Sequence, residues 1–336
     1  MKPLLITGVS GFIGFHLALT LLNQGISVTG IDNNNDYYDP QLKQDRLKQL
    51  QSFPKFNFVC HDIRNNLAAL FKRFKPEVVI HLAAQAGVRY SIDNPNAYVD
   101  SNLIGFINVL EACRHHPVKH LLFASSSSVY GGNVKTPFST EDTVNHPVSL
   151  YAATKKSNEL LAHAYSHLYH MPVTGLRFFT VYGPYGRPDM AYYSFTKNII
   201  EDQPIKVFNH GQMARDFTYI DDVVEAIIKL INQPPKPTKD WDEITGKQSE
   251  SQAPYKIYNI GNHSPETLMD FIGILETHIG KTAKKIFLDM QPGDVLKTYA
   301  DVSDLESAIG FKPKTSLHDG LKLFVTWYKD YHKLNK

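Results

Sequence analysis

A glycine-rich turn near the start of the chain constrains the fold more than any other feature. The stretch T-G-V-S-G-F-I-G at 7–14 lies between a short apolar run at 3–7 and an apolar helical pattern at 12–23, which Gly25 ends. The run has the length of a buried strand, and the pattern that follows has the length of a helix. A strand, a tight turn and a helix in this order predict the first unit of a parallel sheet.

Strand-like and helical patterns continue to alternate through the first half of the chain. Helical patterns, the longest at 97–114 and 149–169, separate apolar runs that fit buried strands. These runs lie at 26–31, 56–60, 77–82, 119–124 and 173–178. The alternation predicts an α/β fold with a doubly wound parallel sheet of the Rossmann type.

The pattern changes after about residue 180, where G-P-Y-G-R-P has the composition of a loop and later elements are shorter. We expect residues 1–180 to form the Rossmann domain and residues 181–336 to form mainly a smaller, mixed α/β substrate domain. Segments near 216–235 and 256–264 are expected to return to the first domain. The stretch 233–255 is rich in proline and charge and is expected to be an exposed loop.

The glycine spacing indicates a dinucleotide site. Gly8 permits the tight turn, Gly11 lets a pyrophosphate approach the free N–H groups of the helix, and Gly14 allows close packing of helix and strand. Glycines can also simply make a turn, but Asp32 ends the next strand. A carboxylate there accepts a hydrogen bond from a ribose 2′-hydroxyl and repels a 2′-phosphate. Because no arginine follows directly in D-N-N-N-D, NAD is favoured over NADP.

Tyr151 and Lys155 form a second constellation. They are four residues apart in the helical pattern at 149–169, so they share one helix face. A nearby cation favours the phenolate, so we expect Lys155 to lower the pKa of Tyr151 and make it a base for an alcohol proton. Four serines at 125–128 follow the run at 119–124 and offer hydroxyls for a substrate oxygen. Alone, such a pair fits a helix surface and such a run fits a polar loop; together with the glycine turn they predict catalysis.

With the glycine turn and Y-x-x-x-K in this order, the chain resembles the extended short-chain dehydrogenase/reductase family over essentially its whole length. The resemblance implies a catalytic set of Ser126, Tyr151 and Lys155. It also implies that both Tyr151 and Lys155 contact NAD. The further cofactor contacts that it implies are Gly8, Gly11, Phe12, Ile13, Gly14, Asp32, Asn33, Asp62, Ile63, Leu82, Ala83, Ala84 and Gln85.

Three stretches of the second half resemble the nucleotide-sugar 4-epimerases of that family. They are R-F-F-T-V-Y-G-P-Y-G-R-P at 177–188, R-D-F-T-Y-I-D-D at 215–222 and Q-P-G-D-V at 291–295. The resemblance implies a UDP-sugar substrate, with Arg215 on the diphosphate. A purely structural alternative for Arg215 is an ion pair with Asp216 or Asp221.

Among these enzymes the resemblance is closest to bacterial UDP-glucuronate 4-epimerases, through D-N-N-N-D-Y-Y-D at 32–39 and Q-A-G-V-R-Y-S at 85–91. UDP-galactose 4-epimerases carry arginine in the place of Gln291 and asparagine in the place of Thr180. The implied reaction is reversible C4 epimerisation of UDP-glucuronate to UDP-galacturonate through a 4-keto intermediate with bound NAD. The implied substrate contacts are Arg89, Ser126, Ser127, Ser128, Tyr151, Thr180, Arg187, Val207, Phe208, Arg215 and Asp294.

Other reactions remain as alternatives. Dehydratases of the family carry Asp-Glu directly after the catalytic hydroxyl residue, and decarboxylases that make UDP-xylose carry a glutamate near it, whereas Ser127 and Ser128 follow Ser126 here. A UDP-glucose or UDP-N-acetylglucosamine 4-epimerase is the nearest rival. A non-catalytic NAD-binding protein is the most distant, because such proteins usually lose the tyrosine or the lysine.

Composition excludes several partners. The 35 basic and 33 acidic residues form no basic patch in the sequence, so we expect no nucleic-acid binding. Two cysteines support neither a disulfide framework nor a zinc site, and no metal is expected. No apolar segment has the length of a membrane span, and the N-terminus lacks a signal-peptide cleavage region, so we expect a cytoplasmic protein without membrane contact. The family resemblance implies a homodimer formed through the helices at 97–114 and 149–169.

Overall fold

A seven-stranded parallel sheet forms the larger part of the molecule. The computed structural model describes residues 3–334, so residues 1–2 and 335–336, at the outer ends of the two predicted domains, lie outside it. All six strand pairings in the sheet are parallel, which confirms the predicted Rossmann-type fold class. From edge to edge the strands are β10 (Tyr255–Ile260), β6 (Val173–Phe178), β5 (His120–Ser126), β4 (Val78–His81), β1 (Leu4–Thr7), β2 (Val28–Asp32) and β3 (Phe56–Cys60).

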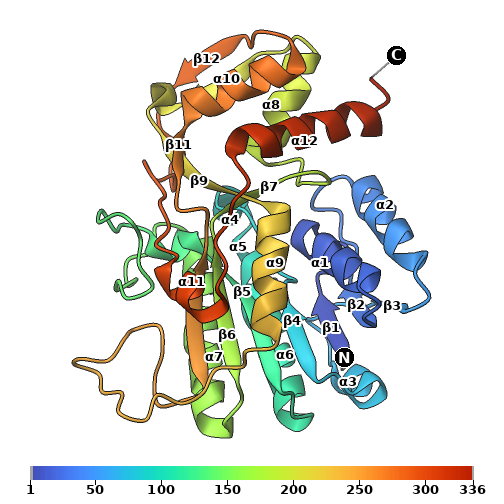
Figure 1. Cartoon of the computed structure of the whole chain (residues 1–336), viewed down its shortest axis with the longest axis vertical. Helices are drawn as coiled ribbons and strands as arrows, with labels where there is room; N and C mark the ends of the chain where they lie inside the picture. The colour runs from blue at the N-terminus through green and yellow to red at the C-terminus, as the bar shows by residue number, and fades with distance from the viewer. Residues whose placement is uncertain (1–2, 335–336) are drawn as a thin grey trace.

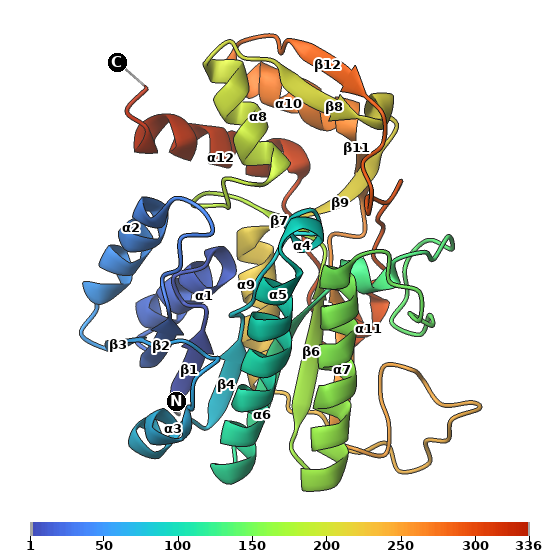
Figure 2. The ribbon, with the colours of Figure 1, turned by 180° about the vertical axis from the view of Figure 1, so that it is seen from behind.

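Helices cover both faces of this sheet. On the face seen in Figure 1, α9 (Ile220–Ile231) packs against α1 (Phe12–Asn23), with α2 (Pro40–Gln51) beside α1. On the opposite face, seen in Figure 2, α6 (Gly105–His115) packs against α7 (Leu150–Tyr169), and α3 (Ala68–Phe74) packs against α6.

The inner strands β1, β4 and β6 are buried on both sides because both sides are covered, whereas the predicted buried strand at 56–60 is the edge strand β3 and is only partly buried. In β1, Leu4 and Ile6 belong to the core beneath α1 and α9, whereas Leu5 lies in the core beneath α6. All three side chains are buried, which explains why the sequence shows a continuous apolar run rather than an alternating one.

A smaller part with mixed sheets lies beyond the carboxyl ends of the parallel strands (Figure 1). In one sheet β9 (Ala214–Tyr219) pairs in parallel with β7 (Thr180–Tyr182) and antiparallel with β11 (Pro265–Thr267). In the other, β8 (Ile205–Phe208) pairs in parallel with β12 (Lys285–Leu288). The helices of the second half other than α9 are α8 (Ala191–Ile200), α10 (Leu268–Ile279), α11 (Ser303–Ile309) and α12 (Leu317–Tyr331).

The predicted helix at 97–114 is interrupted. After α4 (Tyr90–Asp93), the chain forms α5 (Pro95–Tyr98), a π-helical segment (Val99–Ile104) and then α6. Within the π-helical segment, the Asn102 side chain accepts a hydrogen bond from the Gln85 backbone N–H at 2.8 Å and donates to the Gln85 carbonyl at 3.0 Å. Such widened turns often lie at functional sites, and here the turn fixes the chain that leaves β4.

The expectation of an exposed loop at 233–255 is wrong for its last third. Residues 233–248 lack helix and strand and form the orange loop at the lower left of Figure 1. Ser249, Ser251 and Ala253 are buried, and the Ser249 hydroxyl donates to the Glu141 carboxylate at 2.7 Å. This segment is buried because it leads directly into β10 at the sheet edge.

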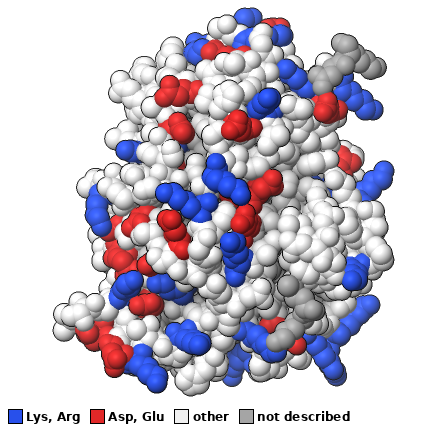
Figure 3. All heavy atoms as spheres, viewed as in Figure 1, with Lys and Arg blue, Asp and Glu red and all other residues white. Residues whose placement is uncertain are grey.

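The surface in Figure 3 carries basic and acidic side chains that are interspersed over the whole visible face. None of the helices within residues 3–334 combines the length and the apolar character needed to span a membrane. The division into two domains stays a prediction.

Candidate active site

A cavity of about 1100 Å³ opens at the carboxyl ends of the parallel strands, between the large sheet and the smaller part. Ligands of doubly wound sheets bind at this edge. The cavity brings together all thirteen glycine-turn and strand-end residues predicted for NAD, together with Ser126, Tyr151 and Lys155. Of the predicted substrate contacts, Arg89, Ser127, Ser128, Thr180, Arg187, Phe208, Arg215 and Asp294 also line it.

The glycine turn leaves space for a pyrophosphate only because it has no side chains. A Cβ on Gly14 would lie 2.2 Å from the Gly8 carbonyl oxygen, and a Cβ on Gly11 would lie 2.9 Å from it. Gly8 itself has a φ of +74°, which glycine adopts without strain. Gly11 caps α1, and no acidic side chain occupies the first turn, so the helix N-terminus is free to bind an anion.

Two carboxylates lie along the same edge, that of Asp32 at the end of β2 and that of Asp62 just after β3. Asp32 accepts hydrogen bonds from the backbone N–H groups of Ser10 at 3.0 Å and Asn34 at 2.8 Å. Burial raises the pKa of Asp32, and these N–H groups and the Lys43 ammonium oppose the rise. Asp62 accepts from the Asn33 amide at 2.9 Å, and the Arg64 guanidinium lowers the pKa of Asp62 to about 2.

These residues fit NAD. The glycine turn would hold the pyrophosphate, and Asp32 would accept from the adenosine ribose hydroxyls while repelling a 2′-phosphate. The side-chain Nε2 of Gln85 is buried at the cavity wall, close to the Tyr98 hydroxyl.

Tyr151 and Lys155 lie on one face of α7, as the spacing predicted. The helix begins after Ser149, whose hydroxyl accepts from the Ala152 N–H at 3.1 Å. The Lys155 ammonium donates to the Ala124 carbonyl at 2.8 Å and lies 6.0 Å from the centre of the Tyr151 ring. Ser126 ends β5, and its hydroxyl accepts from the Ser128 N–H at 3.1 Å.

The electrostatics differ from the sequence expectation. Burial raises the pKa of Tyr151, and the groups that oppose this rise are the Ser126 hydroxyl, through a hydrogen bond, and the charge of Arg187. Lys155 is not among them, so the prediction that it lowers this pKa is corrected. Burial also lowers the pKa of Lys155 to about 8, because its ammonium is enclosed and no carboxylate within residues 3–334 pairs with it.

A buried ion pair packs against the end of β5, where Ser125 and Ser126 lie. The Arg177 guanidinium donates to the two Glu159 carboxylate oxygens at 2.8 and 3.0 Å, and both side chains are almost fully buried. The Ser125 hydroxyl donates to the same carboxylate at 2.7 Å, so this network links β5, β6 and α7 directly beside Ser126. These hydrogen bonds to Glu159 fix the position of α7 against β5 and β6.

The substrate end of the cavity contains two arginines with defined partners, Arg89 and Arg215. The Arg89 guanidinium donates to the Asp294 carboxylate at 2.8 Å and lies 4.5 Å from the centre of the Phe208 ring. Arg215 donates to the carbonyls of Ala214 and Leu296, at 2.9 and 3.2 Å. The alternative ion pair with Asp216 is therefore not formed, since that carboxylate instead accepts backbone N–H groups of Asn262 and Ala300.

Val207 is the one predicted site residue that does not line the cavity. Its side chain is fully buried in the hydrophobic core, whereas its neighbours Lys206 and Phe208 line the cavity wall. Successive residues of a strand face opposite sides, so only the orientation of β8 could decide which of them reaches the cavity.

Several lining residues were missed by sequence reasoning. They are Tyr37, Tyr38, Lys43, Tyr90, Asp189, Asn198 and Lys206. Tyr37, Tyr38 and Tyr90 lie in the very stretches that carry the epimerase resemblance, and Asp189 follows two residues after Arg187. Their closeness in sequence to residues already predicted for the site was the signal that could have identified them. Within residues 3–334 no three metal-ligating side chains converge.

The sequence profile of the NAD dependent epimerase/dehydratase family matches residues 4–261. The chain belongs to this family. It is 56% identical to Protein CapI of Staphylococcus aureus, over 98% of this chain and 99% of that protein. It is 47% identical to UDP-glucuronate 4-epimerase 1 of Arabidopsis thaliana, over 98% of this chain and 77% of the plant protein.

A solved structure shows the same fold. The UDP-glucuronic acid 4-epimerase of Bacillus cereus, in complex with UDP-glucuronic acid and NAD, superposes with a TM-score of 0.87 at 36% identity. The match covers 98% of this chain and 99% of the Bacillus chain. The protein is thus an NAD-dependent nucleotide-sugar epimerase.

Proposed function

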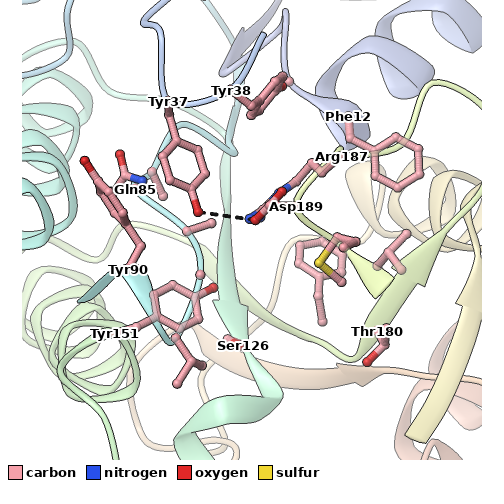
Figure 4. A pocket seen from close by; sticks show the side chains of 18 of the residues that line it. Phe12, Tyr37, Tyr38, Gln85, Tyr90, Ser126, Tyr151, Thr180, Arg187 and Asp189 are labelled. Carbon is pink, nitrogen blue, oxygen red and sulfur yellow. Dashed lines mark hydrogen bonds and ion pairs between the residues drawn. The ribbon is translucent and has the colours of Figure 1, made fainter. Parts of the chain in front are cut away.

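We propose that the protein interconverts UDP-glucuronate and UDP-galacturonate by inverting C4. The observation that carries this proposal is a set of side chains that can donate hydrogen bonds to a carboxylate, in the cavity that holds Tyr151. Arg187 and the hydroxyls of Ser127, Ser128 and Thr180 line this cavity together, and Figure 4 shows Thr180 and Arg187 around the same space as Tyr151. A neutral hexose needs no such cluster, whereas the C6 carboxylate of a uronic acid does. The Arabidopsis and Bacillus relatives support the same substrate.

In the proposed mechanism Tyr151 takes the proton of the C4 hydroxyl while Ser126 orients the oxygen. NAD, when bound, supplies the acceptor for the C4 hydride and the donor for its return. Lys155, buried on the same face of α7 as Tyr151, would hold the nicotinamide ribose. After the 4-keto sugar turns over about its link to the diphosphate, Tyr151 returns the proton, so no net oxidation occurs.

The remaining predicted contacts divide between the two ends of the substrate. Arg215 and Arg89 would hold the diphosphate, since both line the cavity; Arg89 pairs with the Asp294 carboxylate, whereas Arg215 donates to backbone carbonyls. Phe208 would pack beside the uracil. Serine and threonine hydroxyls carry no charge, so they bind a carboxylate by hydrogen bonds alone. The substrate carboxylate can therefore leave them when the sugar ring turns over.

The decisive experiment is to incubate the purified protein with UDP-glucuronate, without added NAD, and to follow products by NMR. Formation of UDP-galacturonate supports both the substrate and a retained cofactor. Absence of conversion, even after NAD is added, refutes the uronic acid assignment. Conversion of UDP-glucose alone would then favour the neutral-sugar epimerase, and appearance of a UDP-pentose with CO₂ would favour a decarboxylase.

We also propose a homodimer formed through α6 and α7, which lie side by side on the face seen in Figure 2. Large apolar side chains are exposed there, including Ile104 just before α6, Ile107 on α6 and Leu160 and Leu168 on α7. Exposed apolar surface of this kind marks interaction sites. Light scattering measures the mass directly: twice the chain mass supports the dimer, and Leu160→Glu is expected to give monomers.

A further inference from the structure

Asp189 fixes the guanidinium of Arg187 at the cavity. The Arg187 Nε donates to one carboxylate oxygen of Asp189 at 3.0 Å, and a terminal nitrogen donates to the other. The Tyr37 hydroxyl donates to the second oxygen at 3.2 Å (Figure 4). Tyr37 comes from the loop after β2, so this contact joins the cofactor side of the cavity to the substrate side.

The arrangement is rigidly packed. The Tyr37 ring meets the Tyr90 ring edge to face, with 4.9 Å between centroids. Gly87 has a φ of +109°, and a Cβ there would lie 2.8 Å from the Tyr37 hydroxyl. The backbone N–H of Arg187 donates to the Tyr192 hydroxyl at 3.1 Å. Backbone and side chain of Arg187 are therefore both held before any substrate binds.

The pair is close to neutral as a unit. Burial tends to raise the pKa of Asp189, but the Arg187 charge and hydrogen bonds outweigh it and leave this pKa below its ordinary value. Asp189 is thus ionised at neutral pH and compensates the guanidinium charge. Among residues 3–334 the Arg187 guanidinium donates only to Asp189. These two hydrogen bonds use two of the five N–H donors of Arg187 and leave three for a ligand.

A compensated arginine suits a substrate that must turn over within the site. A free guanidinium and a carboxylate form a strong bidentate ion pair that fixes one orientation. An arginine that already shares its charge with Asp189 still donates hydrogen bonds but attracts the substrate less strongly. A contact that is stronger in the ground state than during ring turnover raises the barrier to turnover, so an over-tight ion pair to the substrate carboxylate would lower kcat.

We propose that Asp189, oriented by Tyr37, is a positioning residue that moderates the charge of Arg187, so that the carboxylate of the substrate is recognised and yet released during ring turnover. The inference rests on the proposed uronic acid substrate and deepens it. It makes Asp189 a determinant of specificity although its own charge has the same sign as that of the substrate.

The test is Asp189→Asn, which keeps the shape and removes the charge. For UDP-glucuronate we expect the Kd, measured by calorimetry, to fall about tenfold and kcat to fall by a similar factor. The Kd for UDP-glucose should change less than twofold. Asp189→Glu restores the charge and should restore both constants. Asp240→Asn, in the exposed loop far from the cavity, is the control for the change in net charge.

A double variant isolates the charge. Arg187→Gln combined with Asp189→Asn removes both charges, so the tight binding of the single variant should disappear. Weaker binding of both nucleotides to the single variant, or an unchanged Kd for UDP-glucuronate, would overturn the proposal, because structural damage weakens binding and never tightens it selectively. If Asp189→Asn does not fold, the test uses Asp189→Glu. A Kd and kcat for UDP-glucuronate near those of the native protein would then support the proposal, and tighter binding of UDP-glucuronate would overturn it. Failure of the native protein to epimerise UDP-glucuronate is a separate readout and refutes the proposed function itself.

Discussion

Replacing Lys155 by methionine is expected to stabilise the NAD-free protein while abolishing its activity. The Lys155 side chain is 3% exposed, its ammonium has one carbonyl partner, and burial lowers its pKa from 10.5 to about 8. A pKa shift of this size means that the charged form of Lys155 lowers the free energy of unfolding by about 3 kcal/mol. The lost hydrogen bond to Ala124 offsets about 1 kcal/mol, so we expect a net gain of about 2 kcal/mol at pH 7.

The pH dependence identifies the cause. A lysine with a lowered pKa in the folded chain binds fewer protons there than in the unfolded chain between pH 8 and 10.5, so stability rises with pH over that window. The penalty is complete below pH 8 and is relieved as the pH approaches 10.5. The advantage of Lys155→Met should therefore shrink to below about 1 kcal/mol near pH 10. Taking the difference between variant and native protein cancels the other titrating groups.

The assay is urea denaturation of NAD-free protein at pH 7 and pH 10, at equal protein concentration. Lys72→Met, an exposed lysine on α3, is the control and should change stability by less than about 0.5 kcal/mol. A variant less stable than the native protein at pH 7, or an advantage that is the same at both pH values, would refute the reasoning.

Three further predictions concern single sites. Tyr151→Phe should lower kcat by about 10²–10⁴-fold in the NMR assay; a variant within threefold of native activity would remove this residue from the proton-transfer role. Arg177→Met leaves Glu159 buried without its main partner and should cost about 3–5 kcal/mol in urea denaturation, with part recovered when Glu159→Leu is added. Gly14→Ala places a Cβ 2.2 Å from a carbonyl oxygen of the turn and should lower NAD affinity at least about tenfold by titration, whereas Gly273→Ala, whose Cβ meets nothing within 4 Å, should not.

The sequence was informative where function depends on short-range geometry. Residues four apart in a helix share a face whatever the rest of the chain does, so the relation of Tyr151 to Lys155 could be read directly. The spacing of Gly8, Gly11 and Gly14 encodes a turn that excludes side chains, and the clash distances in the structure give the reason. Continuous apolar runs marked the buried parallel strands in the same way.

Other features required the three-dimensional structure. The hydrogen bond that joins Tyr37 to Asp189, 152 residues further along the chain, does not follow from local spacing. Which of Lys206, Val207 and Phe208 reaches the cavity depends on how β8 is packed.

The parallel sheet, the glycine turn and the placement of Tyr151 and Lys155 on one helix face could be predicted from the amino-acid sequence, because these depend on the periodicity and chemistry of neighbouring residues. The electrostatics of the site could not be predicted without the folded arrangement. The pKa of Tyr151 is raised and that of Lys155 lowered because both are enclosed by distant parts of the chain. Desolvation depends on everything that surrounds a group, and that environment exists only once the whole chain has folded.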